Sequence, residues 1–506
     1  MKIFRALFIA VLVLWIGLIS AQPQGELSQY GDKLVLKVWG SHYQRGYAQG
    51  YLLNQRIMNV FHGYYYTMFA FGSPTAYDYF WNWYQQHFSF HPRLYLEAEG
   101  LIDGIAASGT SLWHDGLQRN LTPEDVMQVN AVVDMIQIRN QLRPEAPLEL
   151  GCASLSSWGI STQQDSLLAG SAVITRFLDW SSNDALIANP LLVVHHPSEN
   201  DEQKWMSFTF PGLLGALSAI NESGTAAFLN MGNDYNNPSP NNLTHVLFDI
   251  RDGLELIDAD EDGVNKAEDV YHCLAQGHHY NGTIIHALDE LEGNPNAMVI
   301  ETSNTNTVLR RFNQYGNLPG NHLAATNHFR HGGSTICCER YASIQDSLYA
   351  NHQINAKRQW RVLSGAAGQT HNLSALQYTP STGAILWSAA TLTDPAWSNS
   401  ALSLDREELF DFNVSSSDEL QGPVSLSLKL WPNPVSRGQK LNIEAASGLH
   451  KVEIFNLRGQ KVASYNASGR EASLLLDVDV PASGIYFLRA HDQRGASNTR
   501  RFLVIR

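Results

Sequence analysis

The stretch Gly151-Cys152-Ala153-Ser154 opens a run of residues that is typical of a buried strand. A cysteine that follows glycine at the start of such a strand can attack the preceding carbonyl carbon, and Gly151 has no side chain to obstruct the approach. Cleavage there would give Cys152 a free α-amino group, whose ordinary pKa of roughly 7.7–8.0 suits a general base near neutral pH. The stretch therefore predicts a self-cleaving hydrolase, although a lone cysteine is more often a small buried hydrophobe.

Two charged residues after the next apolar strand support the catalytic interpretation. Arg176 and Asp179 lie close together within Thr175-Arg176-Phe177-Leu178-Asp179. A guanidinium beside a thiol lowers the pKa of that thiol, and a carboxylate can hold both the guanidinium and a new ammonium group in place. A purely structural ion pair at the end of a strand is the alternative.

Two asparagines follow other apolar stretches. A predicted hairpin with its turn at Glu222 to Gly224 places Asn230 beyond a strand, and Asn327 follows Ala324-Ala325-Thr326. An amide N–H at either position could stabilise an oxyanion, whereas a turn residue is the simpler interpretation.

The chain as a whole is long enough for several domains. Its 506 residues, 44% of them hydrophobic, allow two or three globular domains with a substantial core. Lys2 and Arg5 precede the apolar run Ala6 to Ile19, which predicts a secretory signal peptide over residues 1–21, cleaved near Ala21. That run is too short for a confident membrane span, with an uncleaved anchor helix as the alternative, and no later segment reaches spanning length.

The remaining residues divide into three parts and a linker. Residues 22–151 predict a helix-rich pro-part or α subunit, and residues 152–414 predict a catalytic domain in which strands are followed by helices at 269–275 and 284–291. This order favours layered α+β packing. Residues 415–423 predict a linker, and residues 424–506 predict a small β-sandwich of short alternating strands.

The β-sandwich carries specific motifs. They are Trp431-Pro432-Asn433-Pro434, Ile454-Phe455-Asn456-Leu457-Arg458-Gly459-Gln460, Gly484-Ile485-Tyr486-Phe487-Leu488-Arg489 and a basic end with Arg500, Arg501 and Arg506. This part resembles the C-terminal sorting domain of the type IX secretion system of Bacteroidetes. The resemblance implies passage through the periplasm and outer membrane by the type IX machinery, then a secreted or surface location. A carbohydrate-binding or structural β-sandwich is the alternative.

The net charge limits the kinds of substrate or partner, and the cysteine content limits the possible disulfides. The formal net charge is −14, from 48 acidic and 34 basic residues, which argues against nucleic acid because no basic patch would neutralise phosphates. A small, neutral or partly apolar substrate is more compatible with this charge.

The chain has 4 cysteines. Cys337 and Cys338 are neighbours in the sequence, and a disulfide between them would strain the peptide. If Cys152 is a free thiol, Cys273 with one of them is the favoured disulfide.

The motifs from Trp39 to Trp387 together resemble the peptidase C45 family. This family contains acyltransferases and hydrolases related to penicillin acyltransferase, within the choloylglycine hydrolase and acid ceramidase group of N-terminal nucleophile enzymes. The matching residues are Gly40-Ser41, Arg45-Gly46, Gly50, Gly151-Cys152-Ala153-Ser154, Arg176, Leu178-Asp179-Trp180, Asn221, Gly224, Leu229-Asn230, Thr326-Asn327-His328-Phe329 and Arg340.

The resemblance implies a four-layer αββα fold and a role for each matched site residue. Cys152 is the expected nucleophile with Arg176 and Asp179 as its orienting pair. Asn230 and Asn327 are the expected ligands of the oxyanion or tetrahedral intermediate, and Arg340 is a further support. The expected reaction is hydrolysis of a linear amide bond in a small N-acyl substrate without a catalytic cofactor, because export separates the enzyme from coenzyme A.

Three other functions stay open on the sequence alone. The first is an ester or lipid hydrolase resembling the phospholipase-B-like branch. The second is a papain-like protease that uses Cys337 or Cys338 with a nearby histidine. The third is a non-catalytic surface binding protein.

A separate acidic motif predicts a structural calcium site. Asp258, Asp260 and Asp262 occupy loop positions 1, 3 and 5, Gly263 follows at position 6, and Asp269 stands at position 12. This spacing is that of an EF-hand loop, in which oxygen ligands converge on a hard cation. A solvated acidic turn is the alternative.

Overall fold

The computed structural model describes most of the chain from residue 22 onward. The described residues are 22–148, 151–232, 241–314, 318–333, 338–367, 372–411, 428–436, 438–456, 461–478, 480, 482–491 and 497–505. The predicted signal peptide at 1–21 and the predicted linker at 415–423 lie outside them. Within these residues, no helix is long and apolar enough to cross a membrane.

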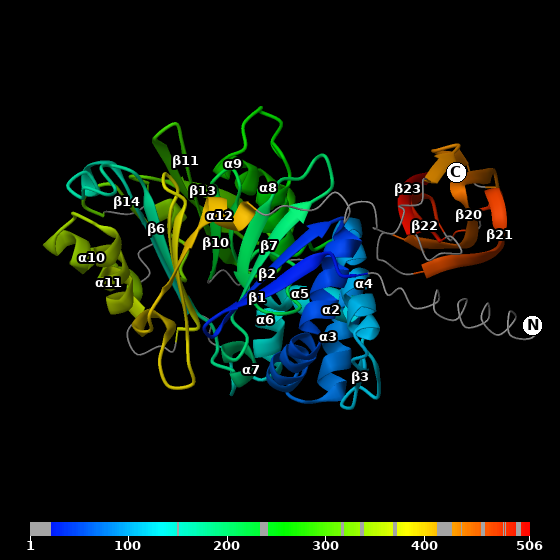
Figure 1. The fold of residues 1–506 in the computed structure, drawn as a ribbon, viewed down its shortest axis with the longest axis horizontal. Helices are drawn as coiled ribbons and strands as arrows, with labels where there is room; N and C mark the ends of the chain where they lie inside the picture. The colour runs from blue at the N-terminus through cyan, green and yellow to red at the C-terminus, as the bar shows by residue number, and fades with distance from the viewer. Residues whose placement is uncertain are drawn as a thin grey trace, which may run out of the picture.

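A large sheet of nine strands runs through the body of the described chain (Figure 1). Its order is β1-β2-β7-β8-β9-β10-β11-β12-β13. The parallel pair β2 and β7 inserts two strands of the pro-part at one edge of this sheet, so residues before Cys152 belong to the same sheet as residues after it. The bounds are Gly25–Tyr30, Lys33–Gly40, Leu191–Pro197, Trp205–Thr209, Ser218–Asn221, Ala226–Met231, Thr283–Leu291, Asn294–Thr302 and Thr307–Arg311 in that order.

A second sheet of six strands carries Cys152. Its order is β14-β5-β6-β15-β16-β17, with bounds His322–Ala325, Gly151–Ser157, Val173–Asp179, Ser374–Thr379, Ala384–Ala389 and Leu402–Asp405. In the antiparallel pair β5 and β6, Cys152 lies opposite Leu178 and Ser154 lies opposite Arg176. The register therefore places the nucleophile and its candidate partners on adjacent strands.

Alternation along the strands decides what each face contacts. Leu34, Leu36 and Val38 of β2 join the core shared with the helices, whereas Val35 packs into the apolar cluster with Ile174 and Leu376 of the second sheet. The two sheets therefore pack against each other through buried aliphatic and aromatic side chains, and the α+β class is confirmed.

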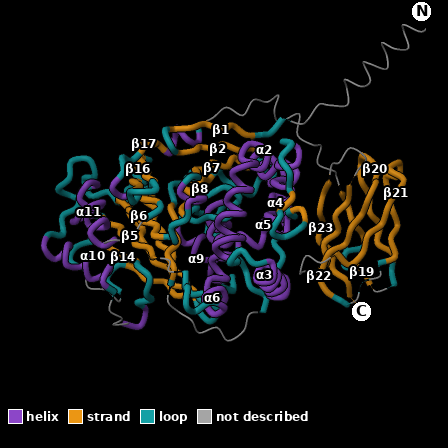
Figure 2. Tube along the Cα trace, turned by 90° about the horizontal axis from the view of Figure 1, so that it is seen from below, coloured by secondary structure: helices purple, strands orange, loops and turns teal. Residues whose placement is uncertain are grey.

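Helices flank both sheets (Figure 2). Those of the pro-part are α2 (His42–Val60), which continues as the π-helix Phe61–Phe69, then α3 (Pro74–His87), α4 (Pro92–Ala107), α5 (Pro123–Asn130) and α6 (Val132–Leu142). After Cys152 come α7 (Asp184–Ile187), α8 (Val246–Glu255), α9 (Ala267–Gln276), α10 (Glu339–Ala350), α11 (Ala356–Ala367) and α12 (Arg406–Phe410). Helices α2, α8 and α9 contact the larger sheet, whereas α10 and α11 contact the smaller one. A short ribbon, β3 (Trp113–His114) with β4 (Arg119–Asn120), lies in the pro-part.

Two predictions of local structure are wrong. Residues 284–291 form strand β11 rather than a helix, because Ile284 to Leu288 is buried on both faces in the sheet and such a short apolar run has no decisive period. Strands β1 and β2, which the sequence did not predict, also lie in the part expected to be helix-rich. Pairing of β2 with β7, which is far along the chain, stabilises them.

The C-terminal part is rich in strands, as predicted, but two pairs of predicted strands merge into the long strands β20 and β21. Its strands are β18 (Leu428–Trp431), β19 (Val435–Ser436), β20 (Lys440–Asn456), β21 (Lys461–Asp477), β22 (Gly484–His491) and β23 (Ser497–Ile505). They surround a separate apolar core. This part lies beside α4 in both views (Figures 1 and 2), where Phe487 packs edge-on against Phe90.

Candidate active site

Cys152 stands at the start of β5, where groups from both sheets surround it. Its side chain is fully buried. Its backbone N–H donates to Asn327 Oδ1 at 3.0 Å, and Arg176 Nη2 lies 3.8 Å from its Sγ. The structure therefore gives the candidate nucleophile a cationic neighbour at its sulfur and an acceptor at its nitrogen.

The environment of Cys152 favours the neutral thiol. Burial raises the pKa of this thiol, Arg176 opposes the rise, and Asp179 adds to it. The backbone of Met231 donates a hydrogen bond that also favours the thiolate. A proton acceptor is therefore required before the sulfur can attack.

Arg176 is held by three groups at once. It is buried in β6, where Nη1 donates to Ser218 Oγ at 2.8 Å and Nη2 donates to the Leu229 carbonyl at 2.6 Å as well as to Cys152. Burial lowers the pKa of this guanidinium, and the neighbouring Cys152 and Asp179 oppose that change. These bonds join β6 to β9 and β10 across the two sheets and fix the guanidinium at the sulfur.

Arg340 organises the other side of the nucleophile. Its Nη2 pairs with Asp179 Oδ2 at 3.2 Å, and its Nη1 donates to Asn327 Oδ1 at 3.0 Å. A Cβ on Gly151 would lie 2.1 to 2.5 Å from this guanidinium. A side chain at position 151 would therefore displace the end of the Arg340 side chain, and glycine leaves this guanidinium in contact with Asp179 and Asn327.

The orientation of the Asn327 amide follows from its partners. The N–H groups of Cys152 and Arg340 can only donate, so the atom that faces both is the amide oxygen. The amide nitrogen donates to the Met231 carbonyl at 2.9 Å. In the uncleaved chain Asn327 is therefore an acceptor toward the nitrogen of Cys152.

Asn230 is arranged differently. It is fully buried, and its Nδ2 donates to Ser154 Oγ at 3.0 Å. Its Oδ1 has no hydrogen-bond partner among the described residues. The structure thus brings together all the predicted site residues, namely Cys152, Arg176, Asp179, Asn230, Asn327 and Arg340.

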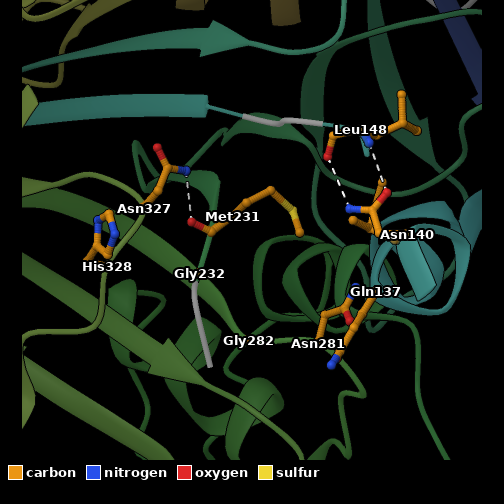
Figure 3. Close-up of a pocket in the computed structure, with 10 residues that line it drawn as sticks. Gln137, Asn140, Leu148, Met231, Gly232, Asn281, Gly282, Asn327 and His328 are labelled. Carbon is orange, nitrogen blue, oxygen red and sulfur yellow. Dashed lines mark hydrogen bonds between the residues drawn. The ribbon is translucent and has the colours of Figure 1, made fainter. Parts of the chain in front are cut away.

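A cavity of about 360 Å³ adjoins these residues. Figure 3 shows Asn327 and His328 on one side of it and Asn140, Gln137 and Asn281 on the other. The lining residues come from both sides of Cys152 in the sequence and are Ile136, Gln137, Asn140, Leu148, Met231, Gly232, Asn281, Gly282, Asn327 and His328. None of them is acidic, lysine or arginine, and burial lowers the pKa of His328, so the wall is uncharged.

The other cysteines do not support the remaining sequence hypotheses. Cys273 and Cys338 are both free thiols, so the predicted disulfide of Cys273 with Cys337 or Cys338 is wrong. The two residues lie in different layers, Cys273 on α9 and Cys338 before α10. Cys338 contacts Thr326 Oγ1 at 3.4 Å rather than a histidine, and Cys337 lies outside the described residues.

The acidic loop is only partly arranged as predicted. Carboxylate oxygens of Asp258, Asp260 and Asp262 lie within 4.8 Å of one another. Asp269 instead accepts backbone N–H groups of Asp260 and Lys266 at 3.0 and 2.8 Å and caps α9.

Sequence reasoning missed several parts of the site. Asn372 donates to Asp179 Oδ1 at 3.2 Å, Met231 contributes its backbone, and α6 of the pro-part lines the cavity. An isolated asparagine, a backbone N–H and a helix face carry no sequence motif, so only the fold reveals them.

Comparison with known proteins identifies the C-terminal part. Residues 429–506 match the family described as "Secretion system C-terminal sorting domain". The chain carries a secretion sorting domain. This sorting domain confirms the predicted export by type IX secretion, with a location at the cell surface or in the medium.

The chain also has more distant relatives. It is 24% identical over 259 residues to protein dcd1B of Dictyostelium discoideum, a match that covers 49% of this chain and 48% of that protein. The chain thus spans about half the length of this curated relative.

Two solved structures are similar to about half of the chain. One is an N-acylethanolamine-hydrolyzing acid amidase ortholog of Caenorhabditis elegans, with 16% identity and a TM-score of 0.33 over 50% of this chain and 100% of that one. The other is a variant of conjugated bile acid hydrolase from Clostridium perfringens, with 12% identity and a TM-score of 0.31 over 50% and 93% of the two chains.

Proposed function

We propose that this exported protein is a cysteine hydrolase of the N-terminal nucleophile type with the four-layer αββα arrangement. It cleaves itself between Gly151 and Cys152 and then hydrolyses the amide bond of a small N-acyl compound. The observation that carries the proposal is the environment of Cys152, whose sulfur lies 3.8 Å from Arg176 and whose nitrogen lies 3.0 Å from Asn327 Oδ1.

Self-cleavage uses the groups already in contact. The Cys152 sulfur attacks the Gly151 carbonyl carbon, the C–N bond breaks, and the nitrogen takes a proton to become the new α-amino group. Water then hydrolyses the resulting thioester, which gives the Gly151 carboxylate and restores the thiol. Because Asn327 Oδ1 accepts from this nitrogen beforehand, it is in position to hold the new amine.

Substrate hydrolysis repeats the chemistry with an external amide. The new α-amino group takes the thiol proton, and the thiolate attacks the substrate carbonyl. An N–H of Asn230 and the backbone N–H of Met231 stabilise the oxyanion. The leaving amine takes the proton, and water releases the acyl group. The uncharged wall of the cavity favours a neutral group at this position of the substrate.

Intact mass and N-terminal sequencing of the exported chain test the proposal. The wild-type protein is expected to split before Cys152 and to hydrolyse a fluorogenic N-acyl aminocoumarin. Cys152→Ala should stay in one piece and be inactive, whereas Cys338→Ala, which removes another buried free thiol, should behave like wild type. Wild-type protein that stays whole and releases no amine would contradict the proposal, and preference for a matched ester would favour the ester hydrolase.

We also propose that the loop from Asp258 to Asp269 binds a structural calcium ion. The three converging carboxylates Asp258, Asp260 and Asp262 supply hard oxygen ligands, and Gly263 has the positive φ of 92° that the sharp bend needs. Addition of Ca²⁺ is expected to raise the melting temperature of the wild type but not of an Asp258→Asn, Asp262→Asn double variant. Equal melting temperatures of the wild type with and without Ca²⁺ would refute the site.

A further inference from the structure

The strand that carries Cys152 also presents two serines on the same face. Alternate residues of a strand point the same way, so Cys152, Ser154 and Ser156 share one side of β5. Across the space between the sheets, His286 of β11 contacts both serines: Nδ1 lies 2.9 Å from Ser154 Oγ and Nε2 lies 2.9 Å from Ser156 Oγ. All four side chains are fully buried.

Asn230 extends this chain of contacts toward the nucleophile. Its Nδ2 donates to Ser154 Oγ at 3.0 Å. The neighbouring Leu229 carbonyl accepts from Arg176 Nη2, which also contacts Cys152 Sγ. The Asn230 side-chain amide is therefore linked to His286 through Ser154, and the backbone carbonyl of its neighbour Leu229 is bonded to Arg176.

The direction of each hydrogen bond follows from simple accounting of protons. The Asn230 amide can only donate at Nδ2, so Ser154 Oγ accepts there. The Ser154 proton then goes to His286 Nδ1, which must be unprotonated. His286 Nε2–H donates to Ser156 Oγ, and the Ser156 proton goes to the Leu323 carbonyl at 3.4 Å. The opposite tautomer would leave the Ser154 hydroxyl without an acceptor among the described contacts.

The charge state of the ring agrees with this assignment. Burial lowers the pKa of His286 to about 3, and the nearby Arg310 adds to the effect. The ring therefore stays neutral over the working range of the protein and takes up no proton from the reaction.

We infer that His286 is a positioning residue that, through the Ser154 hydroxyl, fixes which way the Asn230 amide faces. If the Ser154 proton were free to turn, the amide could rotate and present its oxygen where an N–H is needed. With the proton directed to His286, the nitrogen side of Asn230 is fixed, and its second N–H remains for the oxyanion. The inference rests on the proposed function for its catalytic meaning, whereas the hydrogen-bond chain itself does not.

A second chain of hydrogen bonds, on the opposite face of β5, provides a control for this inference. Gln359 Nε2 donates to Ser157 Oγ at 2.9 Å, Ser157 Oγ lies 2.8 Å from His322 Nδ1, and His322 Nε2 donates to the His352 carbonyl at 2.9 Å. Its histidine is also buried. This second amide, serine and histidine chain faces α11 and touches none of the candidate catalytic residues.

The kinetic experiment compares His286→Leu, His286→Asn and His322→Leu in the full exported chain. Leu removes the acceptor for Ser154, and self-cleavage and turnover of the fluorogenic N-acyl aminocoumarin should fall on the order of 100-fold in kcat with little change in KM. Asn retains an acceptor near the place of Nδ1 and should restore most of the rate, with the pH profile unchanged. His322→Leu should lose comparable thermal stability but keep kcat within about twofold.

Other results would overturn the inference. A folded His286→Leu protein with wild-type kcat would do so, as would an equal loss of kcat in His322→Leu. A shifted pH profile in His286→Asn would instead make His286 a proton-transfer group.

A measurement that does not depend on activity separates this inference from the proposed function. ¹⁵N NMR of histidine-labelled protein should show Nε2 protonated and Nδ1 bare at His286, and His286→Leu should shift the Asn230 side-chain amide signals. If wild type neither cleaves itself nor turns over substrate, the proposed function fails, while these signals still decide whether His286 holds Asn230. A protonated Nδ1, or unmoved amide signals, would refute the positioning role.

Discussion

Two buried polar centres join the pro-part to the residues after Cys152, and they are built in opposite ways. The first is the candidate active site around Cys152. The second, which we call the ion cluster, lies between α2, α4 and α8 and consists of His42, Arg45, Glu97, Glu202, Arg251 and Glu255, all essentially without exposed side-chain area. The site surrounds one thiol with the charged groups of Arg176, Asp179 and Arg340 and with the amides of Asn230 and Asn327, whereas the ion cluster consists of charged groups and contains no thiol.

The charged side chains of the ion cluster come from both sides of Cys152 in the sequence. Glu202 accepts from His42 at 2.8 Å and from Arg45 at 3.0 Å, and Arg251 donates to Glu97 at 2.7 Å. Together with the pairing of β2 and β7, these contacts would hold the part before Cys152 to the rest of the protein after the proposed cleavage at Gly151. Charged groups therefore serve cohesion in the ion cluster, whereas at the site the charged groups Arg176, Asp179 and Arg340 hold a thiol and an amide in place.

The largest effect is expected from breaking the ion cluster. Glu202→Gln removes the carboxylate that His42, Arg45 and Arg93 share. These residues keep Glu97, Glu255 and Asp252 respectively, but the buried cluster is left with one positive charge that is no longer offset, which should cost about 3–5 kcal/mol of unfolding free energy. Urea unfolding followed by tryptophan fluorescence measures this. As a control, Glu145→Gln removes an exposed pair with Arg143 and should cost less than about 1 kcal/mol. Equal losses in the two variants would show that the cluster does not hold the parts together.

A smaller effect, seen in rate rather than stability, is expected at the site. Arg340→Met removes the donor shared by Asp179 and Asn327, so the Asn327 amide loses its fixed orientation and self-cleavage should slow on the order of 100-fold. Stability should change little because Asp179 keeps Asn372 and the Arg340 side chain is 20% exposed. Time courses of intact mass measure the rate, with Arg361→Met on the outside of α11 as control. Unchanged cleavage in Arg340→Met would make Arg340 a surface residue without a role.

The site was more predictable from the sequence than the structure around it. Cys152, Arg176 and Asp179 lie on adjacent strands close in sequence, so local motifs were enough to group them. Asn327 was a candidate from its place after an apolar stretch, whereas Arg340 entered through the family resemblance alone, and the structure places them against Cys152 and Asp179 respectively. The roles of Ser154 in the His286 chain and of Asn372 at Asp179 could not be predicted, because they depend on contacts with residues far along the sequence.

The fold, too, could be predicted only where a sequence pattern is local. Alternating strands in the C-terminal part were visible because each exposes one face, which gives a clear period. Strand β11 was mistaken for a helix because both its faces are buried, which removes the period. The ion cluster left no sequence signal either, since its residues are separated by long stretches and their pairing depends on α2, α4 and α8 coming together.

The smallest effect concerns pH and separates the two centres most directly. Burial and Arg45 oppose protonation of His42, but Glu202 and Glu97 outweigh them and raise its pKa above the ordinary value. The stability that His42 contributes is therefore fully present below the unfolded pKa of about 6.5 and is lost as pH rises through the raised folded pKa. The urea concentration at which half of the wild-type protein is unfolded should therefore fall as the pH rises from about 6.5 through the folded pKa of His42. The His42→Gln variant should not show this fall.

The active site should respond to pH in the opposite direction. Burial raises the pKa of Cys152, so the thiolate fraction and the rate of self-cleavage should grow as the solution becomes more alkaline, while the ion cluster weakens. His42→Gln should leave the pH dependence of cleavage unchanged, because His42 belongs to the ion cluster and not to the contacts of Cys152. Parallel pH profiles of stability in wild type and His42→Gln would mean that His42 carries no charge in the folded protein, and the view of the ion cluster as balanced charges would then be wrong.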